Sequence, residues 1–371
     1  MMKYILTVTI LCCFSLLHAQ ESSLWSVTST EGKHGYGTIF CIGVDGNNFQ
    51  KVHDFKEETG YPFASLAQVD DNLWGVTQGS SDNSSHRHGV IFTFHIRTHN
   101  FKTTHVFNGT NGSKPLGELI AHGDYLYGMA SEGGVNNAGV IYKIHKNGTG
   151  FEKLFDFDSN SGTNPRNSLF FVDGNFWGIT SHGGSNNKGT IFTLDPKSLA
   201  FGKIYDFTAS GIGEPESGLI LSTKMLWGMC TRGGLNNEGG IFKIAPDGSD
   251  FTIVHHFTYP ALGDLIKSKG KLWGMTASRG KYNAGEIFYI NPDDESYTKV
   301  HDFDRINGRF PEGNLLESNN KLYGMTRFGG DHNLGVIFSI STDGTSFKKL
   351  FDFDKNTGGV PYGTLIKVLN H

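Results

Sequence analysis

The sequence predicts an all-β protein, a seven-bladed β-propeller, from three observations. A motif of the LWGM type occurs seven times in the 371 residues, at spacings of 49, 53, 50, 50, 46 and 50. Each repeat carries four short segments rich in β-branched and aromatic residues, which is the pattern of strands. Fifty glycines and 29 phenylalanines accompany only ten prolines, which suits many strands joined by tight turns. Four-stranded units repeated at about 50 residues are typical of propeller blades.

The first segment of each unit contains the motif itself. It reads LWSVTS, LWGVTQ, LYGMAS, FWGITS, LWGMCT, LWGMTA and LYGMTR, starting at residues 24, 73, 126, 176, 226, 272 and 322. All five tryptophans of the chain stand at its second position, and tyrosine fills the other two copies. An aromatic residue at the same place in every blade predicts packing between neighbouring sheets, with sugar stacking as the alternative.

A loop rich in glycine and asparagine follows the motif, as in RGGLNNEGG from Arg232. A glycine loop binds phosphate when a helix follows it, but an apolar strand follows here. In five units an asparagine stands two residues before a glycine, a pair that suits a turn with left-handed backbone. The loop is therefore predicted to be a structural turn. Its asparagines are Asn137, Asn187, Asn237, Asn283 and Asn333.

The second and third segments, such as GTIFCI and the run ending at Phe55, are joined by Asp-Gly or Asn-Gly hairpin turns. The third segment ends at phenylalanine in every unit. Two positions earlier, histidine alternates with phenylalanine and tyrosine, which predicts a flat ring at a packing site. The histidines there are His53, His105, His255 and His301. The acidic residue that follows, as in Asp54, predicts a repeated turn or backbone hydrogen bond rather than catalysis.

A proline and a short strand, such as DLIKS, complete the unit. The chain's last strand, TLIKV, has no later partner, so we expect it to pair with the N-terminal three strands and close the ring. Closure of this kind removes exposed sheet edges. The predicted propeller domain spans residues 20–371.

Residues 1–19 have the layout of a secretory signal peptide: Lys3, a mostly apolar run, and Leu17-His18-Ala19 before Gln20. A membrane anchor would need a longer uninterrupted apolar run. We therefore expect a secreted protein, whether extracellular, periplasmic or at the cell surface, with no membrane insertion after cleavage. Cleavage leaves Cys41 and Cys230, which form neither a disulfide framework nor a metal site of recognisable spacing.

The repeat unit resembles the kelch-type propeller blade. More closely, its pattern LYGxTxxGGxNNxGxIFKI, then DGxxFxxLxxF and a proline strand, resembles the GloVer-type tandem repeats of secreted bacterial proteins. The resemblance covers residues 24–369. It implies a propeller in a secreted bacterial protein and implies no particular activity, because propellers host very different chemistries.

Function is expected where the repeats differ. The loops leaving the LWGM-type strand and the proline loops between blades are predicted to emerge on one face. The residue after each proline and the third residue after the motif vary freely, and the unit from Leu73 carries a longer loop. These positions supply the candidate ligand-binding residues, which are Glu132, Arg166, His182, Glu216, Arg232, Glu312, His86, Arg87 and His88.

Three function classes fit this face. The first is a binding or interaction module for a carbohydrate or protein partner. The second, less favoured, is a polysaccharide lyase or glycoside hydrolase, with Glu216 and Glu312 as paired carboxylates, or His182 and His86 with Arg166. The third is a purely structural repeat protein.

Other classes are disfavoured by charge and composition. A net charge of −4 without runs of like charge gives no footprint for nucleic acid. A kelch-like copper oxidase is disfavoured because neither Cys41 nor Cys230 lies in a setting of tyrosine and histidine. No calcium loop of EF-hand spacing occurs. We expect a monomer without cofactor or metal.

Overall fold

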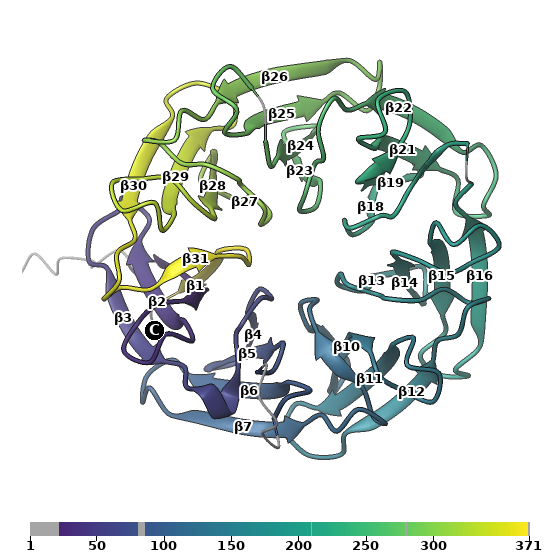
Figure 1. Cartoon of the computed structure of the whole chain (residues 1–371), viewed down its shortest axis with the longest axis horizontal. Coiled ribbons are helices and arrows are strands. Elements are labelled where there is room, and N and C mark those ends of the chain that lie inside the picture. The colour runs from purple at the N-terminus through teal and green to yellow at the C-terminus, as the bar shows by residue number, and fades with distance from the viewer. Residues whose placement is uncertain (1–21, 81–85, 209, 279, 370–371) are drawn as a thin grey trace, which may run out of the picture.

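The computed structural model describes residues 22–80, 86–208, 210–278 and 280–369. The predicted signal peptide, residues 1–19, lies outside these ranges. Seven antiparallel sheets are arranged around a central axis, which confirms the predicted seven-bladed β-propeller (Figure 1). Within the described ranges there is no α-helix, and one 3-10 turn spans Glu57–Thr59.

Blades 1 to 3 are built from the N-terminal half of the chain and from its last strands. Blade 1 contains β1 (Ser22–Thr30), β2 (Thr38–Gly43), β3 (Gln50–Asp54), β31 (Gly359–Pro361) and β32 (Ile366–Leu369). Blade 2 contains β4 (Ala67–Val69), β5 (Asn72–Thr77), β6 (Val90–His95) and β7 (Phe101–Val106). Blade 3 contains β8 (Ser113–Pro115), β9 (Ile120–His122), β10 (Tyr125–Glu132), β11 (Val140–His145) and β12 (Glu152–Asp156).

Blades 4 to 7 follow in chain order. Blade 4 contains β13 (Phe170–Val172), β14 (Asn175–Thr180), β15 (Thr190–Leu194) and β16 (Phe201–Asp206). Blade 5 contains β18 (Ile220–Ser222), β19 (Met225–Cys230), β21 (Gly240–Ile244) and β22 (Thr252–His256), with the small ribbon of β17 (Ile212–Gly213) and β20 (Arg232–Gly233). Blade 6 contains β23 (Ile266–Ser268), β24 (Lys271–Thr276), β25 (Glu286–Ile290) and β26 (Tyr297–Asp302). Blade 7 contains β27 (Leu316–Ser318), β28 (Lys321–Thr326), β29 (Val336–Ser341) and β30 (Lys348–Asp352).

The ring closes as the sequence predicts. Strand β32 pairs with β1 from Ser22 opposite Leu369 to Trp25 opposite Ile366. Strand β31 pairs with the other end of β1, where Thr28 lies opposite Pro361. The C-terminal strands therefore complete the sheet begun by the N-terminal three strands, and the seam between first and last repeat lies inside a blade.

Aromatic residues of the repeat fill the space between blades. The motif aromatic is at most 7% exposed in all seven blades, and the phenylalanine that ends the outer strand is at most 2% exposed. Each core cluster combines the motif residue of one blade with residues of the next blade, as Trp227 does with Leu272 and Phe288. The prediction that these rings are core rather than ligand platforms is confirmed.

A second set of rings joins the outer strands. The residue two before the outer phenylalanine stacks on an aromatic of the adjacent blade, with centroids 3.6–4.6 Å apart and ring planes within 9° of parallel. The seven pairs close a complete circle: His53–Phe101, His105–Phe151, Phe155–Phe201, Tyr205–Phe251, His255–Tyr297, His301–Phe347 and Phe351–Phe49. The four histidines are therefore packing rings, as predicted.

The glycine and asparagine loops are turns that bond to themselves. In blade 4, Asn187 has φ 52°, and its side-chain oxygen accepts the Gly183 N–H at 2.9 Å. Asp206 of the outer strand accepts the N–H of Ser185 at 3.0 Å. The corresponding aspartates of four other blades accept the equivalent N–H. The prediction of a structural turn is confirmed, because side chains of the loop and of the adjacent outer strand accept its backbone N–H groups.

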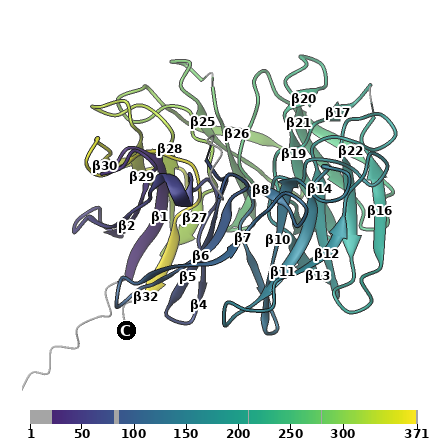
Figure 2. The same cartoon turned by 60° about the horizontal axis from the view of Figure 1, so that its bottom comes forward.

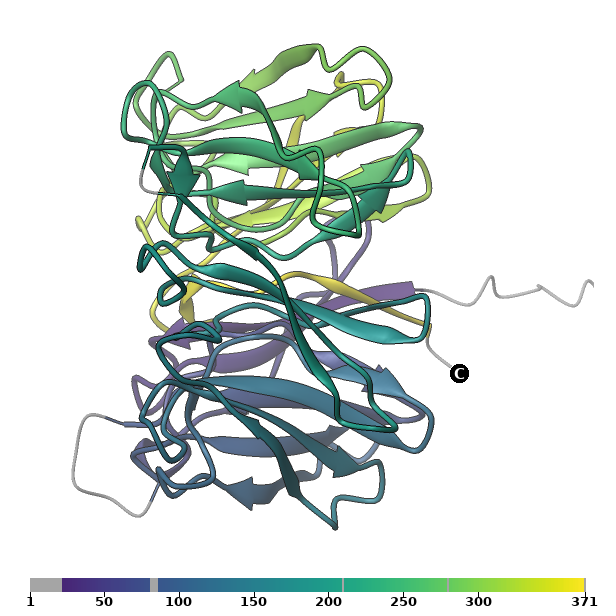
Figure 3. The same ribbon diagram turned by 90° about the vertical axis from the view of Figure 1, so that its right-hand side faces the viewer.

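The two kinds of variable loop lie on one face, as predicted. Backbone bridges join Thr163 to His182 and Arg309 to Phe328, each linking a proline segment to the loop that leaves the motif strand. We call this side the proline-loop face. Strands β17 and β20 lie at this end of the ring in Figure 2, and β32 extends to the other. The start of β1 and the end of β32 lie together on that opposite side (Figure 3).

Candidate ligand-binding site

A cavity of about 280 Å³ lies where the proline loops converge around the central axis. Six of the seven residues that directly follow the inter-blade prolines line it, and blade 6 alone contributes Leu262, one position later. We call these six the upper ring; they are Phe63, Leu116, Arg166, Glu216, Glu312 and Tyr362. A position that varies freely between repeats therefore forms the wall of a single cavity.

A second set of lining residues lies two positions further along each proline segment. We call it the lower ring, and its members are Ser65, Glu118, Ser168, Asp264, Asn314 and Thr364. Backbone N–H groups of one blade donate to lower-ring side chains of the next: Asp264 N–H to Asn314 Oδ1 at 2.6 Å and Thr364 N–H to Ser65 Oγ at 2.9 Å. Three further junctions are bonded in the same way. The lower ring is thus fixed by the assembly of the blades.

Glu118 is the exception in the lower ring. No such bond joins the Ser65 N–H to the Glu118 carboxyl among the described residues, and blade 5 has Gly218 at this position. Burial and, to a smaller extent, the Asp264 carboxylate of blade 6 together raise the pKa of Glu118 to about 7. Burial also raises the pKa of Asp264, against the hydrogen bonds from Gly218 and Asn314. Burial therefore favours the protonated form of the Glu118 carboxyl over the carboxylate.

Charged groups of the upper part of the cavity are paired. Arg166 Nη1 lies 3.0 Å from Glu216 Oε1 of the next blade, and Lys114 Nζ lies 2.7 Å from Glu132 Oε1. Arg327 Nη1 lies 3.1 Å from Glu312 Oε2, whose side chain is only 8% exposed. Because each cation has its own carboxylate, the upper part of the cavity carries little net charge.

One wall of the cavity is aromatic. The rings of Phe63 and Tyr362 meet edge to face with centroids 5.1 Å apart, across the junction of blades 2 and 1. Burial raises the pKa of Tyr362 to about 12, so its hydroxyl keeps its proton and can donate a hydrogen bond. The cavity therefore combines an apolar wall with paired charges and a polar floor.

Four of the nine predicted site residues line this cavity, namely Glu132, Arg166, Glu216 and Glu312. The other five lie elsewhere on the proline-loop face or beside it. Arg232 Nε lies 4.0 Å from Glu214, and the buried Nδ1 of His182 has no partner among the described residues. In the loop of blade 2, Arg87 donates to His88 Nε2, whose Nδ1 lies 3.0 Å from Ser113 Oγ. His86, next in that loop, does not line the cavity.

The lower ring was not predicted. Its signal is the column just before the invariant leucine of each proline strand, which reads Ser, Glu, Ser, Gly, Asp, Asn and Thr around the ring. Every repeat keeps the leucine, whereas the preceding residue ranges from glycine to a carboxylate. The leucine is the same in all seven repeats because it is part of the core. The residue before it differs between repeats because it faces the cavity that the blades share.

Two wider properties complete the description. Across the residues that the structure describes, no group of three or more His, Cys, Asp or Glu side chains could hold a metal ion. No helix in the same ranges is long and apolar enough to span a membrane.

Solved structures resemble the chain over most of its length. The periplasmic gluconolactonase PpgL of Pseudomonas aeruginosa has a TM-score of 0.62 and 15% identity, covering 94% of this chain and 99% of that one. A proposed 6-phosphogluconolactonase of Bacteroides uniformis has a TM-score of 0.61 and 15% identity, covering 94% and 100%. The extracellular domain of a proposed one-component system of B. thetaiotaomicron has a TM-score of 0.54 and 13% identity, covering 84% and 38%. At these identities the likeness shows the propeller fold alone.

Sequence comparison gives the family. No curated protein matches the chain. The Gloeobacter/Verrucomicrobia repeat matches three overlapping segments, residues 13–170, 79–264 and 213–371, which together cover nearly all of the sequence. The chain belongs to the Gloeobacter/Verrucomicrobia repeat family.

Proposed function

We propose that this protein is an exported binding propeller that takes a neutral, hydroxyl-rich ligand, such as one sugar residue of a glycan, into the cavity on the proline-loop face. The observation that carries the proposal is the two-ring wall: fixed polar side chains below and paired charges with an aromatic edge above. Sites for small molecules combine such apolar walls with a few well-placed polar groups.

The pairing of charges favours a neutral ligand. A carboxylate or phosphate ligand would have to compete with Glu216 for Arg166 and with Glu312 for Arg327. Hydroxyl groups donate and accept together, and serine, threonine and asparagine of the lower ring do the same. The apolar face of a sugar ring would lie against Phe63 and Tyr362, whose rings form the apolar wall.

The export part of the proposal rests on the predicted signal peptide. Similar propellers include a periplasmic protein and an extracellular domain, which supports the same assignment. A protein ligand is the other partner class that the proline-loop face would suit, and the experiment below separates it from a glycan.

A carbohydrate-active enzyme is the second candidate, and the buried carboxyl of Glu118 favours it. A proton donor near neutral pH in a polar cavity is what general acid–base catalysis needs. Asp264, buried in the same cavity, supplies a second carboxyl. Binding without turnover separates the two candidates.

A glycan-array screen of the protein, followed by product analysis on each hit, tests the proposal. We expect a glycan hit that is unchanged after prolonged incubation and that the double variant Arg166→Ala/Glu216→Ala binds about tenfold more weakly. Arg232→Ala, which removes a cation of the same face outside the cavity, is the matched control. Turnover lost in Glu118→Gln would establish the enzyme instead. Silence across the array would overturn the glycan proposal and favour a protein partner.

A further inference from the structure

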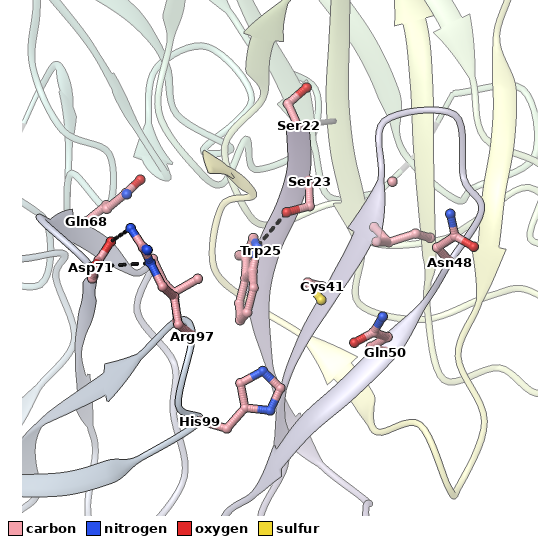
Figure 4. Close-up of a pocket in the computed structure, with 13 residues that line it drawn as sticks. Ser22, Ser23, Trp25, Cys41, Asn48, Gln50, Gln68, Asp71, Arg97 and His99 are labelled. Atoms are coloured by element: carbon pink, nitrogen blue, oxygen red, sulfur yellow. Dashed lines mark hydrogen bonds and ion pairs between the residues drawn. The ribbon is translucent and has the colours of Figure 1, made fainter. Parts of the chain in front are cut away.

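A second cavity, of about 360 Å³, lies between blades 1 and 2. It is lined by Trp25 and Cys41 of blade 1 and by Gln68, Asp71 and Arg97 of blade 2, among others (Figure 4). Ser22, which also lines it, begins β1, whereas Thr28 near the end of β1 pairs with a proline segment. The cavity therefore opens on the face opposite the proline loops, and we call it the seam cleft.

Beside the seam cleft, one row of side chains across blade 1 is short. Trp25 lies opposite Cys41 on β2, and Cys41 lies opposite Gln50 on β3. Directly paired residues project from the same face of a sheet, so these three form one row. In blade 3 the position of Cys41 is taken by Lys143, whose ammonium lies 4.8 Å from the Tyr125 ring centroid.

Blade 6 fills the same place with a ring. Tyr289 stands opposite Trp273 and packs against it at 5.1 Å between centroids, with Lys271 Nζ 3.7 Å from the Tyr289 centroid. Blade 1 has a thiol and Ser23 at the corresponding positions. The space that long side chains occupy in blades 3 and 6 is thus left open beside Trp25.

The chemistry of the cleft is neutral and rich in amides. Trp25 Nε1 donates to Ser23 Oγ at 2.8 Å, so the only polar atom of this buried ring is already bonded within blade 1. Asp71 and Arg97 neutralise each other at 3.3 Å (Figure 4). Gln50 and Gln68 line two sides of the cleft, and each amide holds a donor and an acceptor, which matches a hydroxyl group.

We infer that the seam cleft is a second binding site, for one unit of a neutral, hydroxyl-rich ring such as a monosaccharide. The volume lies at the lower end of the range for small-molecule sites, about 300–1,000 Å³, which suits a single sugar unit. The inference rests on residues that share nothing with the cavity of the proline-loop face. With sites on opposite faces, one molecule would engage two ligand groups at once, and avidity would follow.

Saturation-transfer NMR titrations with glucose, galactose, mannose and N-acetylglucosamine test the seam cleft. We expect at least one sugar to bind with a Kd in the millimolar range and Cys41→Lys to weaken it at least about tenfold. Lysine is the residue that blades 3 and 5 carry at this position. Thr93→Lys places the same side chain at the same position of blade 2 and is the matched control.

Two results separate this site from the proline-loop cavity. The double variant Arg166→Ala/Glu216→Ala must still bind the monosaccharide that Cys41→Lys no longer binds. This result is expected even if no glycan binds in the proline-loop cavity. The inference is overturned if the wild-type protein binds none of the four sugars, or if Cys41→Lys binds them as the wild type does.

Alkylation of Cys41 gives a second readout, which can be followed in the wild-type protein. Burial raises the pKa of the Cys41 thiol to about 11, so iodoacetamide is applied at alkaline pH and modification is followed by mass spectrometry. A sugar at twice its Kd should slow alkylation about threefold, and Gln50→Ala/Gln68→Ala should abolish the protection. Thr252→Ala, the match of Gln50 in blade 5, should leave it intact. Unchanged alkylation with sugar bound would place that sugar elsewhere and overturn the inference.

Discussion

Arg166 and Glu216 occupy the same position of successive repeats, directly after the inter-blade proline, and their side chains meet at 3.0 Å. The repeat symmetry places the residues at this position around one axis, and at the junction of blades 4 and 5 the two neighbours carry opposite charges. The pair therefore joins blades 4 and 5 at the rim of the cavity.

Removing this pair should affect binding more than folding. The side chains are 40% and 32% exposed, and exposed ion pairs contribute about 0–1 kcal/mol. We expect Arg166→Ala and Glu216→Ala each to lower the free energy of unfolding by less than about 1 kcal/mol, while the affinity for a glycan ligand falls. Chemical denaturation and titration of an array hit measure the two effects. Lys188→Ala, which breaks the similar Lys188–Glu214 pair outside the cavity, should leave the affinity unchanged.

Glu118→Gln should remove a pH dependence of stability. The pKa of Glu118 is about 7 in the fold against 4.5 for a free side chain. Between these values the folded protein holds a proton that the unfolded chain has released, so stability falls as the pH rises. The effect reaches at most about 3 kcal/mol above pH 7. We expect the Tm of Glu118→Gln, relative to wild type, to rise from pH 5 to pH 8. A constant difference would show that Glu118 is ionised throughout.

The repeats determine which parts of the fold and of the cavity could be predicted from the sequence. The strands, the closure, the packing rings and the turns recur seven times, so each signal is reinforced by its copies and the fold is read correctly. Arg166 and Glu216 were proposed as candidates because their position differs in chemistry from repeat to repeat, and both line the cavity. Glu118 and Asp264 were missed because their column lies inside a strand pattern, and only the approach of seven loops to one axis buries it. The ion-pair partner of a variable residue, such as Arg327 for Glu312, depends on side-chain rotamers, which the repeat pattern does not specify.

Replacing two stacked histidines should reduce acid sensitivity. Burial lowers the pKa of His53 and His105 to about 4, from 6.5 for a free side chain. Between pH 6.5 and 4 the unfolded chain binds a proton on each ring that the fold excludes, so stability is lost as the pH falls. Phenylalanine stands at this position in blades 3 and 7, so His53→Phe/His105→Phe should keep the stacks and flatten the decline of Tm. His332→Phe, an exposed histidine, is the control. An unaltered slope in the double variant would contradict the assignment.

Two variants of a turn asparagine should separate the contribution of backbone conformation to stability from that of the side-chain hydrogen bond. Asn187 has φ 52° and accepts the Gly183 N–H. Asn187→Ala loses this bond and must hold alanine in the left-handed region, which costs about 1–2 kcal/mol. Asn187→Gly loses the same bond without that penalty. We expect the glycine variant to be clearly more stable than the alanine variant by chemical denaturation. Equal losses would assign the whole effect to the hydrogen bond.

The pairing of Ser22 with Leu369 makes blade 1 sensitive to a force that pulls the start of β1 away from the end of β32. Because β1 and β32 are antiparallel neighbours and their outer ends lie together, a force applied to both ends loads their hydrogen bonds one after another rather than all at once. Strands pulled in this way unzip. Tension on the chain would therefore open blade 1 first, next to the seam cleft, before it reached the loops of the opposite face.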